Sequence, residues 1–515
     1  MPEYLSPGVY IEEVARGTRP IEAVGTALAA FVGFTDKAED MQDDGTLASL
    51  LKKPTLVTNW SQYVQKFGGF AANAYLPYAV YGYFQNGGGR CYVVSVKTLG
   101  KPSSPELAVP AAAMLPAGDE AGGDALEIQA REGGLGGNAL KVQVRDEEGE
   151  AFALVIQGPS GAPETFEGLT TGKGATNVAT MVNAQSKLVT IKVVKSGPKP
   201  KVGTYSLAGG QVKTTAVAVA DYKGDPAERT GIGGLEAVDG VTMLAVPDLM
   251  SSYQSGELDL KGVQAVQMAM YEFCERNKYC FAILDAPPGL SPQQAKEWRL
   301  KANYDTRYGA LYYPWLRVAD MSGGNGASRL VPPSGHIAGI YARNDTERGV
   351  HKAPANEVVA GAIDLAIQVT KGEQDVLNPL GVNCIRSFPG RGIRVWGART
   401  LSSDPAWRYV NVRRLFNMIE ESIERGTQWV VFEPNDPDLW ARVRRDVRAF
   451  LTVVWRSGAL FGTTPEQAFF VKCDEETNPL ETRDLGQLII EIGIAPVKPA
   501  EFVIFRISQW AGAAE

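Results

Sequence analysis

Apolar runs and amphipathic segments alternate over residues 24–97. The stretches 26–35 (TALAAFVGFT) and 91–98 (CYVVSVKT) are almost continuously apolar, as strands buried on both faces are. Between them, residues 56–69 and 75–88 carry apolar side chains at helical spacing, and each segment ends in glycines. Strands and helices joined by short turns predict an α/β layer.

The same alternation resumes after residue 234. Two apolar strands are expected at 241–246 and 279–284, with a helix at 262–277 between them. The remaining elements expected in the layer are a helix at 292–303, a strand at 310–318 and a closing amphipathic helix at 356–369. The layer is therefore predicted to consist of two sequence segments.

Residues 101–234, which separate those segments, have a different character. Short β-like runs such as LEIQA, LKVQVRD, AFALVIQ and LVTIKVV are separated by Gly, Asp and Pro turns. This pattern predicts an all-β insertion, a small sandwich or barrel, that interrupts the α/β unit.

A third unit begins near residue 376. Two long amphipathic helices are predicted at 410–426 and 438–458, and each ends in a glycine suited to a helix stop. Short strands are expected at RVWGA, WVVFE and AFFVKC, followed by LGQLIIEIGIAP and a last strand, EFVIFRIS.

These patterns predict an α/β fold class, α+β overall, with several domains. The expected parts are a strand arm at 1–20, an α/β core at 21–100 plus 235–375, an inserted β domain at 101–234, a C-terminal α+β domain at 376–499, and a strand arm at 500–515. The N-terminal arm has too few apolar residues for a core of its own. An ordinary first strand of the chain's own sheet is the alternative reading of that segment.

Charge and cysteine content exclude some classes of protein. The net charge of −7 argues against nucleic acid as the main partner, because phosphate binding needs a basic excess. Five scattered cysteines without a C-x-x-C spacing indicate reduced thiols and synthesis in a cytoplasm. The N-terminus has no export-signal pattern, and no apolar run approaches the ~18 residues of a membrane helix.

Few residues are arranged for catalysis or ligand binding. His336 and His351 lack the neighbours of a zinc site, and Ser334 with His336 is expected in a Pro/Gly turn without a G-x-S-x-G elbow. The segment GLTTGKGA departs from P-loop spacing and lacks the Ser/Thr after Lys173. We therefore expect no metal and no cofactor, and predict that the chain is not an enzyme.

Asp248 and Asp285 provide the strongest argument for an enzyme. Each follows an apolar strand, where α/β enzymes place catalytic carboxylates. An aspartate in this position also commonly caps the next helix or turn, and nearby prolines favour that reading. An α/β hydrolase-like enzyme using these residues therefore remains an alternative.

A resemblance to a known family covers most of the chain outside 101–234. The segments PPSGHIAGIYARND, GVHKAPANE, LNPLGVN, VWGARTL, WRYVNVRRLF and FEPND occur in this order, with SPGVYIEEV, VDGVTMLAVPDL, YCFAILDAPPG and PAEFVIFRISQ further out. Together they resemble the tail sheath proteins of contractile phages and phage-like injection systems. The resemblance implies a protomer that polymerises as stacked hexameric rings around an inner tube and contracts to drive the tube through a target envelope.

The resemblance also implies partners and places for the parts. The expected partners are other copies of the chain in a helical homo-oligomer, the inner tube protein, and baseplate and tail-terminator or cap proteins. The β insertion is expected on the outer surface, the C-terminal domain facing the tube, and the chain in a phage tail or phage-like particle. The sequence leaves open a phage, a tailocin or another injection system, and a non-contractile tube or capsid component is a further alternative.

The arms and one basic helix face are the expected contact residues. The residues expected in the inter-subunit strand arms are Val9, Tyr10, Ile11, Glu12, Glu13 and Val14 at one end, and Phe502, Val503, Ile504, Phe505, Arg506 and Ile507 at the other. Arg442, Arg445 and Arg448 are candidates for facing an acidic tube, and a simple solvated helix face is the alternative.

Overall fold

The structure, a computed structural model, describes residues 20–42, 46–100, 108–118, 123–159, 161–212, 216–322 and 327–506. The chain divides into two compact units. The C-terminal unit contains residues up to 26, residues 344–354 and residues from 403 onward. The sheet unit contains residues 27–343 and 355–402. The predicted α/β fold class, α+β overall, is confirmed.

A nine-stranded sheet organises the sheet unit. Its order is β20 (Glu357–Val358), β23 (Gly392–Val395), β22 (Val382–Phe388), β17 (Gly309–Tyr313), β16 (Phe281–Asp285), β15 (Met243–Ala245), β1 (Ala29–Thr35), β5 (Cys91–Thr98) and β4 (Thr55–Val57). The strands from β22 to β5 are parallel, and antiparallel strands close both edges. Every residue of β1, β16 and β17 is buried, which explains their apolar sequences.

The strand order reverses between β1 and β15. β5 follows β1 in the chain and lies on one side of it, whereas β15, β16, β17 and β22 succeed one another on the other side. In open α/β sheets, the carboxyl ends of the strands at such a reversal commonly form a ligand-binding crevice. The groups at the ends of β1 and β15 therefore occupy the position where an α/β enzyme would bind its ligand.

Helices α6 (Leu260–Asn277) and α7 (Pro292–Ala302) lie where the sequence predicts helices. The Asp259 carboxylate accepts the backbone N–H of Gly262 at 2.8 Å and caps α6. Ser291 and Gln294 cap α7 reciprocally, each side chain accepting the other's backbone N–H. Local side-chain chemistry therefore sets where both helices begin.

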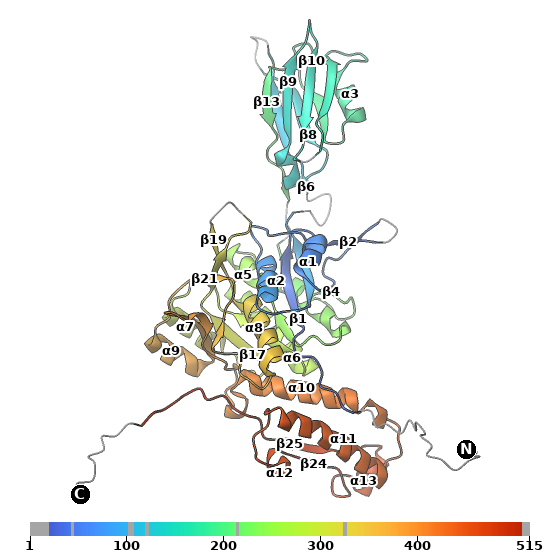
Figure 1. Ribbon diagram of the computed structural model, residues 1–515. Helices are drawn as coiled ribbons and strands as arrows, with labels where there is room; N and C mark the ends of the chain where they lie inside the picture. The colour runs from blue at the N-terminus through green and yellow to red at the C-terminus, as the bar shows by residue number, and fades with distance from the viewer. Residues whose placement is uncertain are drawn as a thin grey trace, which may run out of the picture. The chain divides into compact units, whose positions relative to one another are not determined.

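The inserted residues form small antiparallel sheets around a core of their own (Figure 1). The elements are β6 (Ala108–Val109), β7 (Ala112–Pro116), β8 (Asp124–Ala130), β9 (Lys141–Asp146), β10 (Phe152–Gln157), β11 (Glu164–Leu169), α3 (Val178–Gln185), β12 (Val189–Val193), β13 (Gly203–Ser206) and β14 (Gln211–Val212). One sheet has the order β11, β10, β9, β13, and another has the order β12, β8, β7. Alternate residues such as Leu126, Ile128, Val142 and Leu154 are fully buried, so the period-two pattern marks the core-facing side.

The C-terminal unit packs two long helices with a two-stranded antiparallel sheet. Its main elements are α10 (Val410–Gly426), α11 (Pro437–Arg456), α12 (Pro465–Ala468), β24 (Phe469–Lys472), α13 (Leu480–Asp484) and β25 (Glu491–Ile494). β24 and β25 pair in antiparallel register. Leu415, Val443, Val447 and Leu451 belong to the buried core. Both amphipathic helices expected here are confirmed.

Three local predictions are wrong. The helix expected at 356–369 is replaced by β20 and β21 (Ala362–Leu365), because Gly361 adopts a positive φ of 84° between them. Ser334 and His336 begin α8 (Ser334–Arg348) rather than occupying a turn, since prolines 332 and 333 precede its start. WVVFE is not a strand: it covers the end of a 3-10 turn (Gln428–Val430) and the turn that follows, where Phe432 has a positive φ of 67°.

Two other expectations differ from what the structure places in each region. Residues 376–402 were assigned to the C-terminal domain, but β22 and β23 belong to the nine-stranded sheet, where β22 pairs with β17. The local sequence of a buried parallel strand next to an edge hairpin does not show which strand it pairs with. The last strand was expected at EFVIFRIS, yet residues 501–506 have no ladder partner within the described chain.

Close packing between α8 and α2 (Leu76–Gln85) gives a stability test. A Cβ at Gly335 would lie 2.3 Å from Ala79 Cα, so the two backbones meet there without room for a side chain. We expect Gly335→Ala to lower the free energy of unfolding by about 1–3 kcal/mol through overpacking. Urea unfolding followed by tryptophan fluorescence measures this change.

Gly372 is the matched control for that substitution. It lies in α9 (Lys371–Leu377), and a Cβ there would meet nothing within 4 Å. We expect Gly372→Ala to leave stability unchanged or to raise it by up to about 1 kcal/mol, because alanine favours helix. Equal effects of the two substitutions would contradict the close-packing explanation.

Candidate assembly site

The crevice expected at the strand reversal is filled by the chain's own carboxylate. Asp248 follows β15 and is fully buried. Its oxygens accept backbone N–H groups of Phe34 at 2.7 Å, Leu76 at 2.9 Å and Tyr75. The donors from residues 75 and 76 belong to the start of α2, where doubly wound proteins often bind an external anion. Asp248 therefore joins the end of β1 to the start of α2.

Asp285 has a similar structural role at the end of β16. Its carboxylate accepts the Ser334 backbone N–H at 2.9 Å and the Ser334 hydroxyl at 2.6 Å, which stabilises the first turn of α8. Burial raises the pKa of Asp248 and the pKa of Asp285 to about 7, although the hydrogen bonds oppose both shifts. Both aspartates thus hold the first turn of a helix that is distant in sequence, whereas the sequence offered a cap on the next helix or turn as the alternative to catalysis. The side chain of Asp248 makes no cap on α5 (Leu249–Gln254), the helix that follows it.

Ser334 and His336 have different hydrogen-bonding surroundings. Ser334 donates to Asp285, while His336 is buried against Gly82 of α2 and its Nδ1 has no hydrogen-bond partner. Burial lowers the pKa of His336 to about 4, so it is neutral near pH 7. Among the described residues, no group of three or more His, Cys, Asp or Glu side chains is placed to hold a metal ion. Nor does any helix in the described ranges have the length and apolar character to cross a membrane.

A cavity of about 800 Å³ lies at the carboxyl ends of β1 and β5. Its charged lining groups already have partners inside the chain. Lys97 Nζ lies 2.5 Å from the Glu257 carboxylate, and the Arg329 guanidinium stacks 5.0 Å from the centre of the Tyr75 ring. Its lining contains no histidine or cysteine to act as a base or thiol nucleophile.

The clearest functional arrangement lies in the C-terminal unit, where α10 holds the segment that follows the N-terminal arm. Arg414 donates to both Asp345 oxygens, at 2.9 and 2.6 Å, and also to the Thr26 carbonyl at 2.9 Å. The Thr26 hydroxyl donates to the same carboxylate at 2.6 Å. Arg414 and Asp345 side chains are each only 4% exposed, so this is a buried, bidentate ion pair.

Two further contacts fix the same segment. The backbone N–H of Val24 donates to the Ser422 hydroxyl at 3.0 Å. Ile21 is buried in the core of the unit and lies against Gly426 at the end of α10. The base of the N-terminal arm is therefore attached along the length of α10. Residues 1–19, which include the predicted arm residues Val9–Val14, lie outside the described residues.

The other end of α10 holds the segment that leads to the C-terminal arm. Asn411 Nδ2 donates to the Val497 carbonyl at 3.3 Å, and the Tyr409 hydroxyl donates to the Glu501 carboxylate at 3.0 Å. The Val497 N–H donates to Ala459 O at 3.1 Å. One helix thus anchors the bases of both chain-end segments.

Beyond Glu501 the described chain forms neither helix nor strand, and it is exposed. Phe502, Val503, Ile504 and Phe505 are between 70% and 83% exposed. Residues 502–506 make no hydrogen bond with the rest of the described chain. Apolar β-prone residues with unpaired backbone groups are suited to pairing with another strand. Ile507, also predicted in this arm, lies outside the described residues.

The three arginines predicted as possible tube contacts lie on α11 with exposed side chains. Arg442 pairs with Glu433 at 3.3 Å and stacks on Trp429. Arg445 contacts Asp446, and Arg448 lies 3.4 Å from Glu466. Their side chains are 44–58% exposed, so contact with a tube stays a prediction.

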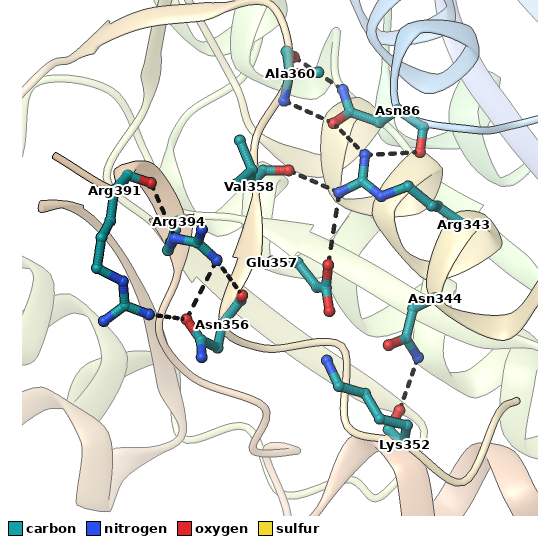
Figure 2. Close-up of polar contacts among 10 residues, drawn as sticks. All are labelled: Asn86, Arg343, Asn344, Lys352, Asn356, Glu357, Val358, Ala360, Arg391 and Arg394. Atoms are coloured by element: carbon teal, nitrogen blue, oxygen red, sulfur yellow. Dashed lines mark hydrogen bonds and ion pairs between the residues drawn. The ribbon is translucent and has the colours of Figure 1, made fainter. Parts of the chain in front are cut away.

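Sequence reasoning missed the polar residues that organise both units. In α10, Asn411, Arg414 and Ser422 are buried, although arginine and asparagine in an amphipathic pattern indicate a solvated face. In the sheet unit, Asn86 exchanges two hydrogen bonds with Ala360, and Arg343 donates to the Val358 carbonyl (Figure 2). The only signal for these residues in the sequence is that their segments carry more polar residues than one solvent-exposed helix face requires.

Family models match two adjoining parts of the chain. The model of the phage tail sheath protein central domain matches residues 258–401, and that of the phage tail sheath C-terminal domain matches residues 402–509. The junction of the two matches coincides within one residue with the boundary between the two structural units at residues 402 and 403.

The chain is also similar to tail sheath proteins in sequence and to a solved sheath structure. The tail sheath protein of Vibrio phage KVP40 is 29% identical over 219 residues, covering 42% of this chain and 31% of that protein. The tail sheath protein of Burkholderia phage BcepMu is 26% identical over 375 residues, covering 68% of this chain and 72% of that protein. The cryo-EM structure of the anti-feeding prophage helical sheath in its contracted state has 26% identity and a TM-score of 0.61, covering 98% of this chain and 99% of that one. The match spans about a third of the KVP40 protein's length.

The different surroundings of the two buried aspartates predict opposite effects of amidation at pH 8. An asparagine at 285 keeps both hydrogen bonds, since its amide can donate to the Ser334 hydroxyl and accept the Ser334 N–H. At 248, three backbone N–H donors face the side chain, and the NH₂ of an asparagine cannot accept any of them. At pH 8 we expect Asp285→Asn to raise the free energy of unfolding by about 1 kcal/mol and Asp248→Asn to lower it by about 1–3 kcal/mol.

The pH dependence has a defined sign. The folded pKa of Asp285 is raised from 3.8 to about 7, so its contribution to stability is fully present below the unfolded pKa and is lost progressively as the pH rises to the folded pKa. Asp285→Asn should remove that loss, and its stability advantage should disappear at pH 5. Urea unfolding curves at pH 5 and pH 8 check both variants. A stability loss for Asp285→Asn at pH 8 would contradict the hydrogen-bond analysis.

Proposed function

This chain belongs to the contractile tail sheath family, and we propose on that basis that it is the structural protomer of a contractile sheath. Copies polymerise as stacked hexameric rings around an inner tube, and a rearrangement of the copies shortens the sheath and drives the tube through a target envelope. The chain works as part of a phage tail or a phage-like injection particle.

The anchoring of both chain-end segments on α10 carries this proposal. Arg414 and Ser422 hold residues 24–26, while Tyr409 and Asn411 hold residues 497–501. A strand donated to a neighbouring copy transmits force only if its base is fixed in its own subunit. Here both bases are fixed to the same 17-residue helix, so a pull on one arm passes along α10 to the other.

Strand donation explains how a polymer forms without a closed interface. An arm that adds a strand to a sheet edge of the next copy uses backbone hydrogen bonds, which do not depend on the partner's side chains. Contacts of this head-to-tail kind repeat indefinitely when the rotation between copies does not close a ring. The exposed residues Phe502–Phe505 provide the apolar side chains of such a strand at the C-terminal end.

Contraction in this proposal needs no nucleotide or cofactor bound to the chain. The energy is stored in the assembled extended state and is released when the copies move to a state with better packing. Asp248 and Asp285 have no catalytic step in it, because each carboxylate is used to hold a helix start. The partners are other copies of the chain, the inner tube, the baseplate and a terminating cap protein, with the α11 arginines as candidates for the tube.

Truncation of the arms tests the proposal. We expect the full chain to form hollow ribbed tubes in negative-stain electron microscopy, and a variant lacking residues 1–19 or residues 502–515 to remain as separate copies. The C-terminal unit should stay folded in both variants, because the anchors on α10 involve residues 24–26 and 497–501. Circular dichroism and thermal melting check that the truncated chains are folded.

Deletion of the inserted β domain is the control for removing chain length. The insertion has its own buried core, and we expect its loss to leave tube formation intact. Tubes from both arm truncations would remove the arms from assembly. A full chain that stays a single compact particle at all salt and protein concentrations would overturn the sheath proposal itself.

A further inference from the structure

The outer edge of the nine-stranded sheet carries an organised pair of arginines (Figure 2). Asn356, just before the edge strand β20, has a positive φ of 60°, a conformation that asparagine tolerates better than most residues. Its side-chain oxygen accepts Arg391 Nη2 at 2.8 Å, and its backbone carbonyl accepts Arg394 Nη1 at 2.7 Å. Arg394 Nε also donates to the Arg391 carbonyl at 3.0 Å. The two arginines are thus held through a single asparagine.

Two aromatic rings support Arg391. Phe388 and Trp396, on either side of the hairpin turn, have ring centres 4.5 Å apart. The Arg391 guanidinium lies 5.7 Å from the centre of each ring. These contacts fix the arginine side chains before any partner arrives, so the rotamer entropy that binding would otherwise cost is already lost.

The positive charges of this pair are not neutralised by the described part of the chain. Neither Arg391 nor Arg394 forms an ion pair with a described carboxylate, whereas nearby Arg343 lies 3.9 Å from Glu357. Arg391 uses one of its five N–H donors in a described hydrogen bond. In a chain of net charge −7, two preorganised and unneutralised guanidinium groups form a specific site for carboxylates.

The C-terminal unit carries a surface with complementary chemistry. In α13, the exposed residues Leu480, Glu481 and Asp484, with Leu485 directly after, have the i, i+1, i+4, i+5 spacing of one helix face. Glu481 and Asp484 form no ion pair within the described chain. Leu480 and Leu485 are 63% and 74% exposed, so they can contribute apolar area to a contact formed by this face.

The position of α13 is fixed by contacts at its base. Asn478 Nδ2 donates to the Ile489 carbonyl at 3.0 Å, and the Ile489 N–H donates to Asn478 Oδ1 at 2.7 Å. Asp474, just ahead of it, accepts the backbone N–H groups of Glu476 and Thr477. The acidic face of α13 is therefore held on a rigid loop, as a binding surface should be.

We propose that the platform formed by Arg391, Arg394, Phe388 and Trp396 docks the acidic face of α13 from a second copy of this chain. The carboxylates of Glu481 and Asp484 would accept the guanidinium N–H groups that Arg391 and Arg394 do not use within the chain. The leucines of α13 would cover apolar surface beside the platform, where Val358 of the edge strand is 41% exposed. The contact is head-to-tail, because the platform and α13 are different surfaces of one chain. This inference rests on the proposed self-assembly and assigns residues to one of its contacts.

Charge reversal with complementation tests the contact. Arg391→Glu with Arg394→Glu makes one variant, and Glu481→Lys with Asp484→Lys makes the second. Each is expected to raise the protein concentration needed for tube formation at least tenfold, measured by sedimentation and negative-stain microscopy. A chain that carries all four changes is expected to return to within about threefold of the unmodified chain, because the pairs are restored with opposite charges.

The matched control is a double variant, Lys141→Glu with Lys192→Glu, at two exposed lysines of the inserted domain. It changes the net charge by the same amount as the first variant. Thermal melting checks that every variant is folded. The proposal is overturned if either reversal alone assembles like the unmodified chain, or if the fourfold variant fails to recover. Failure of the unmodified chain to form tubes would instead overturn the proposed sheath function, so the two failures are distinguishable.

Discussion

The buried ion pair between Arg414 and Asp345 holds together a unit that the sequence divides into three pieces. Thr26, Asp345 and Arg414 come from its three separate segments and meet in one hydrogen-bonded group. A buried pair of this kind gives little net stability compared with apolar packing, but the loss of one partner costs about 3–5 kcal/mol because the other charge stays buried. The pair therefore specifies which segments join more than it stabilises them. The attachment of both chain-end segments to α10 depends on that arrangement.

A similar principle explains why an enzyme-like sheet has a structural role here. The strand reversal between β1 and β15 places backbone N–H donors where many α/β proteins bind a substrate or cofactor anion. Asp248 occupies those donors with a carboxylate from the same chain. A site filled by its own side chain cannot exchange ligands, but it connects the end of one strand to the start of a helix. The carboxylate therefore fixes that strand and that helix to each other within the sheet unit.

The sequence predicts regular elements well and long-range partners poorly. Helices α6, α7, α10 and α11 are predictable because their apolar spacing is local, and α6, α7 and α11 also have a local side-chain cap. Strands β1 and β5 are predictable because burial on both faces leaves a continuous apolar run. The strands β20 and β21 were mistaken for a helix since short apolar runs with one glycine fit both periods. The strand arms remain a prediction from the family resemblance, and the sequence did not predict the residues that hold the segments next to them. Arg414 and Asp345 lie 69 residues apart in sequence, and nothing local links an arginine to its carboxylate.

Three hydrogen-bonded polar clusters share a feature that bears on how the copies in the proposed sheath could move. Arg414 with Asp345, Asp248, and Asn356 with Arg391 each join segments that are distant in sequence, and each lies within one structural unit. Directional hydrogen bonds resist bending inside a unit, whereas apolar contacts tolerate small shifts. If specific polar contacts stay inside units and the arms connect copies through backbone pairing, a large rearrangement of the copies breaks none of these polar clusters. Copies of this chain can then change their relative positions while each unit keeps its internal structure, which is the physical requirement for contraction without dissociation.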